Sequence, residues 1–371
     1  MAERSRPPFR ADHVGSFLRP PALLAARADH ARGILNASEL RQREDQAIRQ
    51  IVRQQEDLGF EAVTDGEFRR TYFHLDFLRH FANVSIGEAK LAARFRTADG
   101  VLEMHPPALL VVGKIGRASP IFVDDFKFTQ SVTRNTAKLT IPSPSAMHFR
   151  GGRAAIDTAI YPDIEEFYAD VGKAYSDEIR DLGAAGCTYL QLDEVNLAYL
   201  CDLALHAQVR AVGEDPASLP RAYARLINAA VAGRPSTMTV CMHLCRGNFR
   251  SGWVAEGGYE PVADLLFNEI AVDGYFLEYD TERAGNFEPL RFVPKGKTIV
   301  LGLVSTKTAM LESKDELKRR IEQASRYVAL DQLALSPQCG FASTVEGNKL
   351  TADEQFAKLR LVVEVAREVW G

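Results

Sequence analysis

The stretch Cys187-Thr188-Tyr189-Leu190-Gln191-Leu192-Asp193 is a short apolar run that ends on a carboxylate. Its β-branched and aromatic residues are typical of a buried strand. An amphipathic helix pattern precedes it, with apolar residues recurring at three- and four-residue spacing from Ile164 to Leu182 and Gly183 as the expected stop. A helix followed by a buried strand is the repeating unit of α/β proteins with parallel sheets.

The same alternation recurs along the chain. Seven further segments have the character of strands: 11–14, 61–65, 137–141, 237–242, 274–277, 298–303 and 332–335. Two later helices have a start signal, because Ser313 and Thr351 are each followed three residues later by a glutamate that fits a capping box. Eight strand–helix units predict an α/β fold of the (β/α)8 TIM-barrel type, forming one catalytic domain over residues 1–371.

Residues from about 74 to 135 interrupt this alternation. Turn signals at Asp99-Gly100 and Gly116-Arg117 separate strand-like pieces in this part of the chain. We therefore expect an inserted loop or hairpin region after the second strand rather than a separate domain.

The composition excludes several classes of protein. With 371 residues, 46% of them hydrophobic, and a formal charge of −4, nothing favours a nucleic-acid or membrane partner. Five cysteines in a chain of this length do not form a secreted disulfide framework. No apolar stretch approaches the roughly 18–20 residues that span a bilayer. We expect a cytoplasmic enzyme that acts on small molecules, with a homo-oligomer left open.

The candidate chemistry lies at the ends of the expected strands. His243, Cys245, Glu278 and Cys339 each end or follow a strand and supply an imidazole, two thiolates and a carboxylate. Zinc takes these ligand types in a tetrahedral shell. His243 and Cys245 are two residues apart, so on an extended chain both side chains point the same way. The alternative is a hydrogen-bonded barrel histidine with two core cysteines, and Cys241 is expected to be such a core thiol.

Further polar residues follow other expected strands, among them Ser16, Glu67, Asp193 and Glu194. In a TIM barrel the carboxyl ends of the strands meet at one mouth, where the catalytic groups lie. This coincidence is the strongest indication from pattern alone that these residues share one site.

Six short motifs carry a resemblance to a known family: His13-Val14-Gly15-Ser16-Phe17, Asp65-Gly66-Glu67, Leu192-Asp193-Glu194, His243-Leu244-Cys245, Leu277-Glu278 and Gln338-Cys339-Gly340. The motifs occur in this order and cover almost the whole chain. By these motifs the sequence resembles the catalytic barrel of cobalamin-independent methionine synthase in a short, single-barrel form. The resemblance implies one Zn²⁺ per chain and no cobalamin. It also implies that His243, Cys245, Glu278 and Cys339 are the zinc ligands.

The resemblance further assigns the substrates. It implies transfer of a methyl group from a donor to the thiol of homocysteine, giving methionine. The loop at Gly15 and Ser16 would hold the substrate carboxylate, and Glu67 and Asp193, the expected catalytic residues, would hold its ammonium group. The alternative for these two carboxylates is a structural ion pair with an arginine such as Arg70.

The methyl donor stays open between a methylfolate and another compound. The full-length relatives have a histidine in the loop after the seventh strand, whereas this chain has Leu303-Val304-Ser305-Thr306-Lys307-Thr308 there. Four residues are candidates to shape a donor pocket or are simply loop and core residues: Tyr72, Phe73, His74 and His148.

Two other functions fit the same ligands. One is a zinc-thiolate alkyltransferase of the epoxyalkane:coenzyme M transferase type, although that thiol has no ammonium group for Glu67 and Asp193. The other is a binding or sensing barrel whose zinc is structural.

Overall fold

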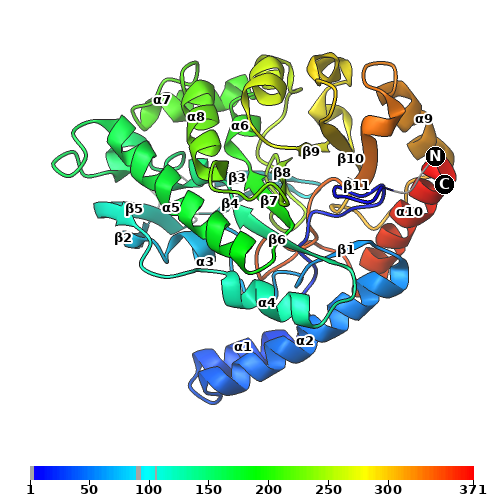
Figure 1. Ribbon diagram of the computed structural model, residues 1–371, viewed down its shortest axis with the longest axis horizontal. Helices are drawn as coiled ribbons and strands as arrows, with labels where there is room; N and C mark the ends of the chain where they lie inside the picture. The colour runs from blue at the N-terminus through cyan, green and yellow to red at the C-terminus, as the bar shows by residue number, and fades with distance from the viewer. Residues whose placement is uncertain (1–3, 89–92, 105–106) are drawn as a thin grey trace.

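The computed structural model describes residues 4–88, 93–104 and 107–371, so residues 89–92 and 105–106 of the expected insertion lie outside the described residues. The protein is an α/β fold built on one curled parallel sheet in the order β1-β6-β7-β8-β9-β10-β11 (Figure 1). The strands of this sheet are β1 (Ala62–Val63), β6 (Thr136–Pro142), β7 (Tyr189–Glu194), β8 (Thr239–Leu244), β9 (Gly274–Glu278), β10 (Thr298–Val304) and β11 (Leu333–Pro337).

The strand expected at residues 11–14 is reduced to a single parallel bridge between Ala11 and Leu335 of β11. The backbone N–H of Asp12 donates to the carbonyl of Leu335 at 3.0 Å. The Asp12 carboxylate also accepts the backbone N–H of its neighbour His13 at 2.8 Å. Because this local bond replaces a ladder hydrogen bond, the segment lies beside the sheet without forming a regular strand.

The interior of the curled sheet holds a buried ion pair. Lys138 of β6 lies 3.0 Å from Asp12, and the Tyr189 hydroxyl donates to the same carboxylate at 2.7 Å. The Lys138 ammonium also lies 4.0 Å from the ring centroid of Phe276. Cys241 packs in this core with Tyr189 and Phe276, as expected for a deep core thiol.

Helices cover the outer face of the sheet (Figure 1). Those described are α1 (Pro21–Ala31), α2 (Ala37–Leu58), α3 (Leu75–Leu78), α4 (Val123–Ser131), α5 (Ile164–Ala184), α6 (Asn196–Tyr199), α7 (His206–Ala211), α8 (Leu219–Val231), α9 (Lys314–Ala324) and α10 (Ala352–Trp370). The expected capping box is complete at Thr351 before α10, whereas Ser313 before α9 accepts the Glu316 N–H without the reciprocal bond. Helix α5 continues past Gly183, and the left-handed residue that follows it is Gly186.

The eight-unit pattern is incomplete on one side of the sheet. Between β8 and β9 the described chain forms a 3-10 turn and the π-helical segment Leu265–Glu269, and between β9 and β10 it forms only the 3-10 segments Glu282–Ala284 and Glu288–Phe292. At these two connections short 3-10 and π-helical segments therefore stand where the pattern predicts an α-helix. Apolar residues in them still pack onto the sheet, so the core is covered without α-helices.

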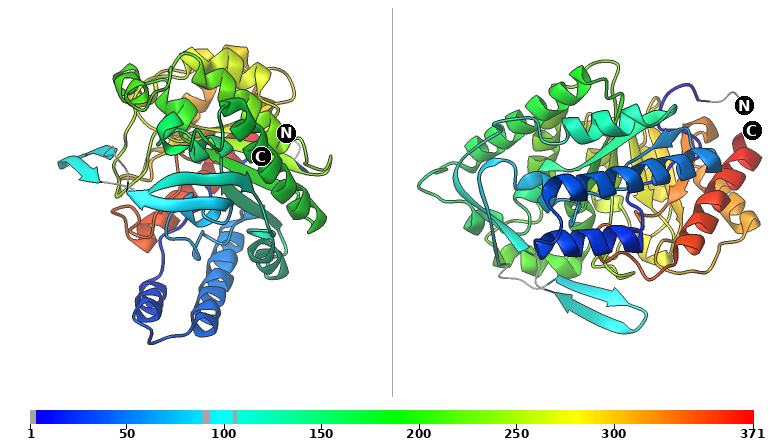
Figure 2. Two further views of the ribbon diagram at one scale, coloured as in Figure 1. Left: turned by 90° about the vertical axis from the view of Figure 1, so that its left-hand side faces the viewer. Right: turned by 90° about the horizontal axis from the view of Figure 1, so that it is seen from below.

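Between β1 and β6 the chain forms two antiparallel pairs, β2 (Ala82–Glu88) with β5 (Pro107–Gly116), and β3 (Ala93–Thr97) with β4 (Gly100–Met104). The β3–β4 hairpin projects from the body of the protein in both views of Figure 2. Paired backbone hydrogen bonds with Trp253 are made by Arg96, which lies next to the turn of this hairpin. Among the described helices, none is long and apolar enough to cross a membrane.

Candidate metal centre

Three of the four expected ligands form one buried cluster. The ligand atoms of His243, Cys245 and Cys339 all lie within 4.8 Å of one another, and the two sulfurs are 3.4 Å apart. His243 belongs to β8, Cys245 directly follows this strand, and Cys339 follows β11. The curl of the sheet thus brings together residues that are 94 positions apart in the sequence.

The turn after β11 depends on a glycine. A Cβ atom on Gly340 would lie 1.9 Å from the Ser16 hydroxyl oxygen, so only glycine lets the chain pass the Ser16 loop at this distance. The backbone N–H of Gly247 donates to the Cys245 sulfur at 3.2 Å. These contacts fix the two cysteine sulfurs at the carboxyl end of the sheet.

The two thiols share one proton. The hydrogen bond from Cys245 lowers the pKa of Cys339 well below its ordinary value, and the same contact raises the pKa of Cys245. Burial opposes a charge on His243, but the neighbouring Cys339, Asp193 and Glu278 together raise its pKa. The contact between the two sulfurs thus favours a negative charge on Cys339 over one on Cys245.

This donor set fits a zinc ion. Two Zn–S bonds of about 2.3 Å in a tetrahedral shell place the sulfurs roughly 3.8 Å apart, so the sulfurs, at an Sγ–Sγ distance of 3.4 Å, need to separate by only a few tenths of an ångström to hold the ion. In the described part of the chain neither ring nitrogen of His243 makes a hydrogen bond. A buried imidazole with no partner, next to two sulfurs, is a ready nitrogen ligand.

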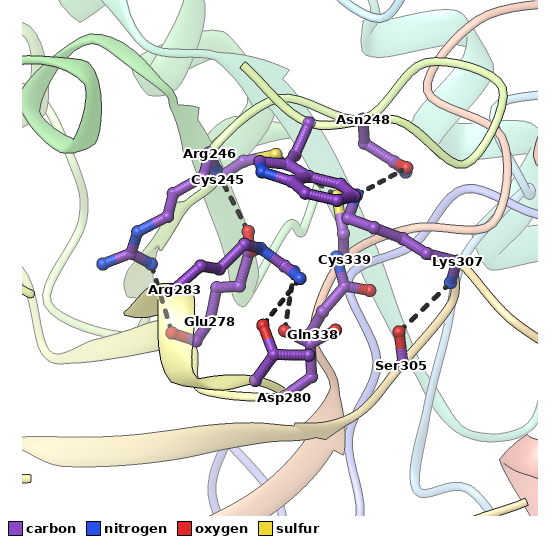
Figure 3. A network of polar contacts seen from close by, with 12 residues as sticks. Cys245, Arg246, Asn248, Glu278, Asp280, Arg283, Ser305, Lys307, Gln338 and Cys339 are labelled. Atoms are coloured by element: carbon purple, nitrogen blue, oxygen red, sulfur yellow. Dashed lines mark hydrogen bonds and ion pairs between the residues drawn. The ribbon is translucent and has the colours of Figure 1, made fainter. Parts of the chain in front are cut away.

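Glu278 lies apart from the three-residue cluster. Its carboxylate accepts the backbone N–H of Arg246 at 3.0 Å and the Arg283 side chain, with Nε at 3.1 Å (Figure 3). Burial raises the pKa of Glu278, but the charge of Arg283 outweighs it, so the carboxylate is ionised. Glu278 as a fourth ligand stays a prediction.

Two buried carboxylates line the same cavity as the cluster. Glu67 accepts the Thr140 hydroxyl on one oxygen at 2.8 Å, and that oxygen lies 3.4 Å from Arg70, as the ion-pair alternative supposed. Its other oxygen has no hydrogen-bond partner among the described residues. Burial, with the charge of Glu67 adding to it, raises the pKa of Asp193 to about 7. Two buried carboxylates with Arg70 as their one ion-pair partner among the described residues are a site for a further cation.

The Gly15–Ser16 loop reaches the cavity from the first segment. Gly15 has φ of +122°, a conformation that favours glycine, and its carbonyl accepts the Thr64 hydroxyl at 2.6 Å. Ser16 also lines the cavity and is buried. The metal and substrate residues predicted from the sequence therefore surround one space, with the exceptions of Glu278 and Gly15.

Of the four residues expected to shape a donor pocket, three line the cavity: Tyr72, Phe73 and His74. His148 is placed elsewhere, with its ring 2.9 Å from the Tyr223 hydroxyl and 3.1 Å from Glu214.

Glu194 accepts the backbone N–H groups of Asn196 and Leu197 and so begins α6.

Sequence reasoning missed the cations around Glu278. Arg283 binds Glu278 and Asp280 (Figure 3). Arg246 is fully buried and donates to the Tyr259 hydroxyl, and Lys307 donates to the carbonyl of Gly247. Arg246 directly follows Cys245, and Arg283 lies five residues after Glu278. These positions could have indicated the partners of Glu278, since a buried carboxylate needs a nearby cation.

The comparisons with known proteins agree with this geometry. The family described as "Cobalamin-independent synthase, Catalytic domain" matches residues 9–368. The uncharacterized protein YxjH of Bacillus subtilis is 46% identical over 99% of this chain and 96% of its own. A structural-genomics target from Listeria monocytogenes, named provisionally as a vitamin B12-independent methionine synthase, is 36% identical with a TM-score of 0.80, covering 99% of this chain and 100% of that one.

A B12-independent methionine synthase from Shewanella sp. W3-18-1, solved with selenomethionine, has the same fold with a TM-score of 0.69 at 21% identity, covering 97% of each chain. The match to the family over nearly the whole chain confirms the resemblance that the sequence motifs carried. The chain therefore belongs to the cobalamin-independent methionine synthase family, whose members are methyltransferases.

Proposed function

We propose that the protein is a zinc-dependent S-methyltransferase that moves a methyl group from a donor to homocysteine, giving methionine. His243, Cys245 and Cys339 are the proposed ligands of one Zn²⁺ per chain, with Glu278 as the fourth. When bound, zinc lowers the pKa of a thiol, so that the substrate sulfur is present as a thiolate at neutral pH.

The chain's own residues orient the substrate. In the proposal Glu67 and Asp193 bind the ammonium group of homocysteine, and the Gly15–Ser16 loop binds its carboxylate. The substrate sulfur then forms a bond to the methyl carbon as the bond from that carbon to the donor breaks. The leaving atom of the donor takes the electron pair and a proton.

One observation carries the proposal: a buried His–Cys–Cys cluster and two buried carboxylates, those of Glu67 and Asp193, line a single cavity. A zinc ion with a purely structural role does not require the carboxylates of Glu67 and Asp193 in the same cavity. A thiol that carries a sulfonate and no ammonium, as coenzyme M does, gives these two carboxylates no cation to bind.

The finer description of the fold is part of the proposal. We infer a single (β/α)8 domain over residues 1–371, in which the 11–14 segment is the first barrel strand and residues from about 74 to 135 are an insertion after the second. The parallel bridge from Ala11 to β11 and the hydrogen bond from the Thr64 hydroxyl to the Gly15 carbonyl support it.

The function is tested by incubating the purified, zinc-loaded protein with homocysteine and candidate donors, and following methionine by mass spectrometry. 5-Methyltetrahydrofolate is the first donor to supply. Methionine formed only with zinc bound is the expected result. Preference for coenzyme M over homocysteine as the acceptor would overturn the proposal.

A further inference from the structure

A second cavity of about 260 Å³ adjoins the cavity of the metal cluster. Its walls are largely apolar and include Val101, Phe149, Leu205, Val209 and Val254. Arg150 and Tyr199 line both cavities, so this pair of side chains belongs to the wall that the two spaces share. A molecule lying in the second cavity would contact the same two side chains that face the cluster.

Arg150 is a cation that has no counterion in the part of the chain that the structure describes. Two other arginines of the second cavity are paired, Arg94 with Glu103 at 3.1 Å and Arg96 with Glu256 at 2.5 Å. For Arg150 there is no hydrogen bond or ion pair within residues 4–88, 93–104 and 107–371, and burial lowers its pKa. A partly buried guanidinium of this kind favours an anionic ligand and repels a cationic one.

His74 presents a second unused polar group on the first cavity. It is 6% exposed, and both ring nitrogens are buried without a hydrogen-bond partner among the described residues. Burial, together with the charge of Arg150, holds the pKa of His74 well below its ordinary value. Its imidazole is therefore neutral and offers one donor and one acceptor.

The polar ends of the amino-acid substrate are already matched by other residues in the proposed function, namely Glu67, Asp193 and the Gly15–Ser16 loop. The proposed function does not use Arg150 and His74. Both side chains line the cavity of the cluster, and Arg150 also lines the second cavity. We propose that the second cavity receives the body of the methyl donor, with Arg150 binding an anionic group of the donor and His74 giving it a hydrogen bond. This inference rests on the proposed function and excludes sulfonium and quaternary ammonium donors.

A pair of probes that differ only in charge tests the site without turnover. We expect 4-phenylbenzoate to bind the zinc-loaded protein about tenfold or more tightly than 4-phenylbenzamide, measured by calorimetry, because hydrogen bonds to a charged group are worth about that factor. Arg150→Gln should abolish the preference, and Arg150→Lys, which keeps the charge, should retain part of it. Arg319→Gln, at an exposed pair on α9, is the matched control and should behave as the wild type.

Two further readouts separate this proposal from the function on which it rests. In Arg150→Gln the KM for 5-methyltetrahydrofolate should rise about tenfold, while zinc content and homocysteine binding stay at wild-type values. Equal binding of the acid and the amide by the wild type would overturn the assignment of Arg150 while leaving the methyltransferase standing. Loss of homocysteine affinity in Arg150→Gln would instead assign this guanidinium to the amino-acid carboxylate and also reject the proposal.

Discussion

Asp193 and His243 occupy matched positions in the parallel pairing of β7 and β8. Side chains at matched positions of adjacent parallel strands point to the same face of the sheet. The carboxylate proposed to bind the substrate ammonium is thus next to the imidazole proposed to bind zinc. This register sets the distance between the amino-acid end of the substrate and its sulfur.

Asp193→Asn should weaken homocysteine binding while leaving zinc in place. The charge-assisted contact to the ammonium group is worth about 1.5–3 kcal/mol, so the Kd for homocysteine should rise roughly 10- to 100-fold. Calorimetry with zinc-loaded protein measures the Kd, and elemental analysis measures the metal. Asp315→Asn, on a fully exposed side chain, is the control. Equal losses of zinc and homocysteine would contradict the separate roles.

Cys245→Ser and Cys339→Ser should each lose stoichiometric zinc and methyl transfer together, because a serine hydroxyl is a poor ligand for zinc beside a soft thiolate. Cys187→Ser provides the control, since this buried thiol donates to the Tyr189 carbonyl, away from the cluster. Zinc content and turnover are compared in the same preparations. Full turnover in either cluster variant would reject the assigned site.

Arg283→Gln should change zinc affinity through Glu278. Arg283 holds the Glu278 carboxylate, and loss of a partner that orients a metal ligand typically costs about 10- to 100-fold in affinity. Competition with a chelator measures the affinity. Arg291→Gln, at an exposed pair with Glu260, serves as the control. A Kd for zinc equal to that of the control would remove Glu278 from the ligand set.

Lys138→Met should destabilise the protein by about 3–5 kcal/mol, because it leaves the Asp12 carboxylate buried without its cation. Chemical denaturation followed by circular dichroism measures the free energy of unfolding. The double variant Asp12→Asn with Lys138→Met removes both charges and should recover much of the loss. A double variant no more stable than the single one would show that the charge imbalance is not the cause.

Most of the sheet could be predicted from the sequence, because each buried parallel strand is a short apolar run between turn signals. The 187–193 run became β7 and the 298–303 run became β10 within one or two residues. The segment at 11–14 was less predictable, since the local bonds of the Asp12 carboxylate replace part of the ladder. The missing helices around β9 were also unpredictable, because short 3-10 and π segments carry no apolar period of their own.

The cluster itself could be predicted in part. His243 and Cys245 share a strand end, so their proximity follows from local geometry, whereas Cys339 joins them only through the curl of the sheet. The partners of Glu278, and the lack of a described partner for Arg150, depend on which side chains meet in space. No spacing in the sequence predicts either of these two features. Resemblance to the family supplied the ligand set that residue patterns alone left open.

X-ray absorption at the zinc edge, with and without homocysteine, tests the central claim most directly. The account predicts two sulfur neighbours in the resting protein, from Cys245 and Cys339, and three when homocysteine is added. A sulfur count that does not change on saturation with homocysteine would contradict it.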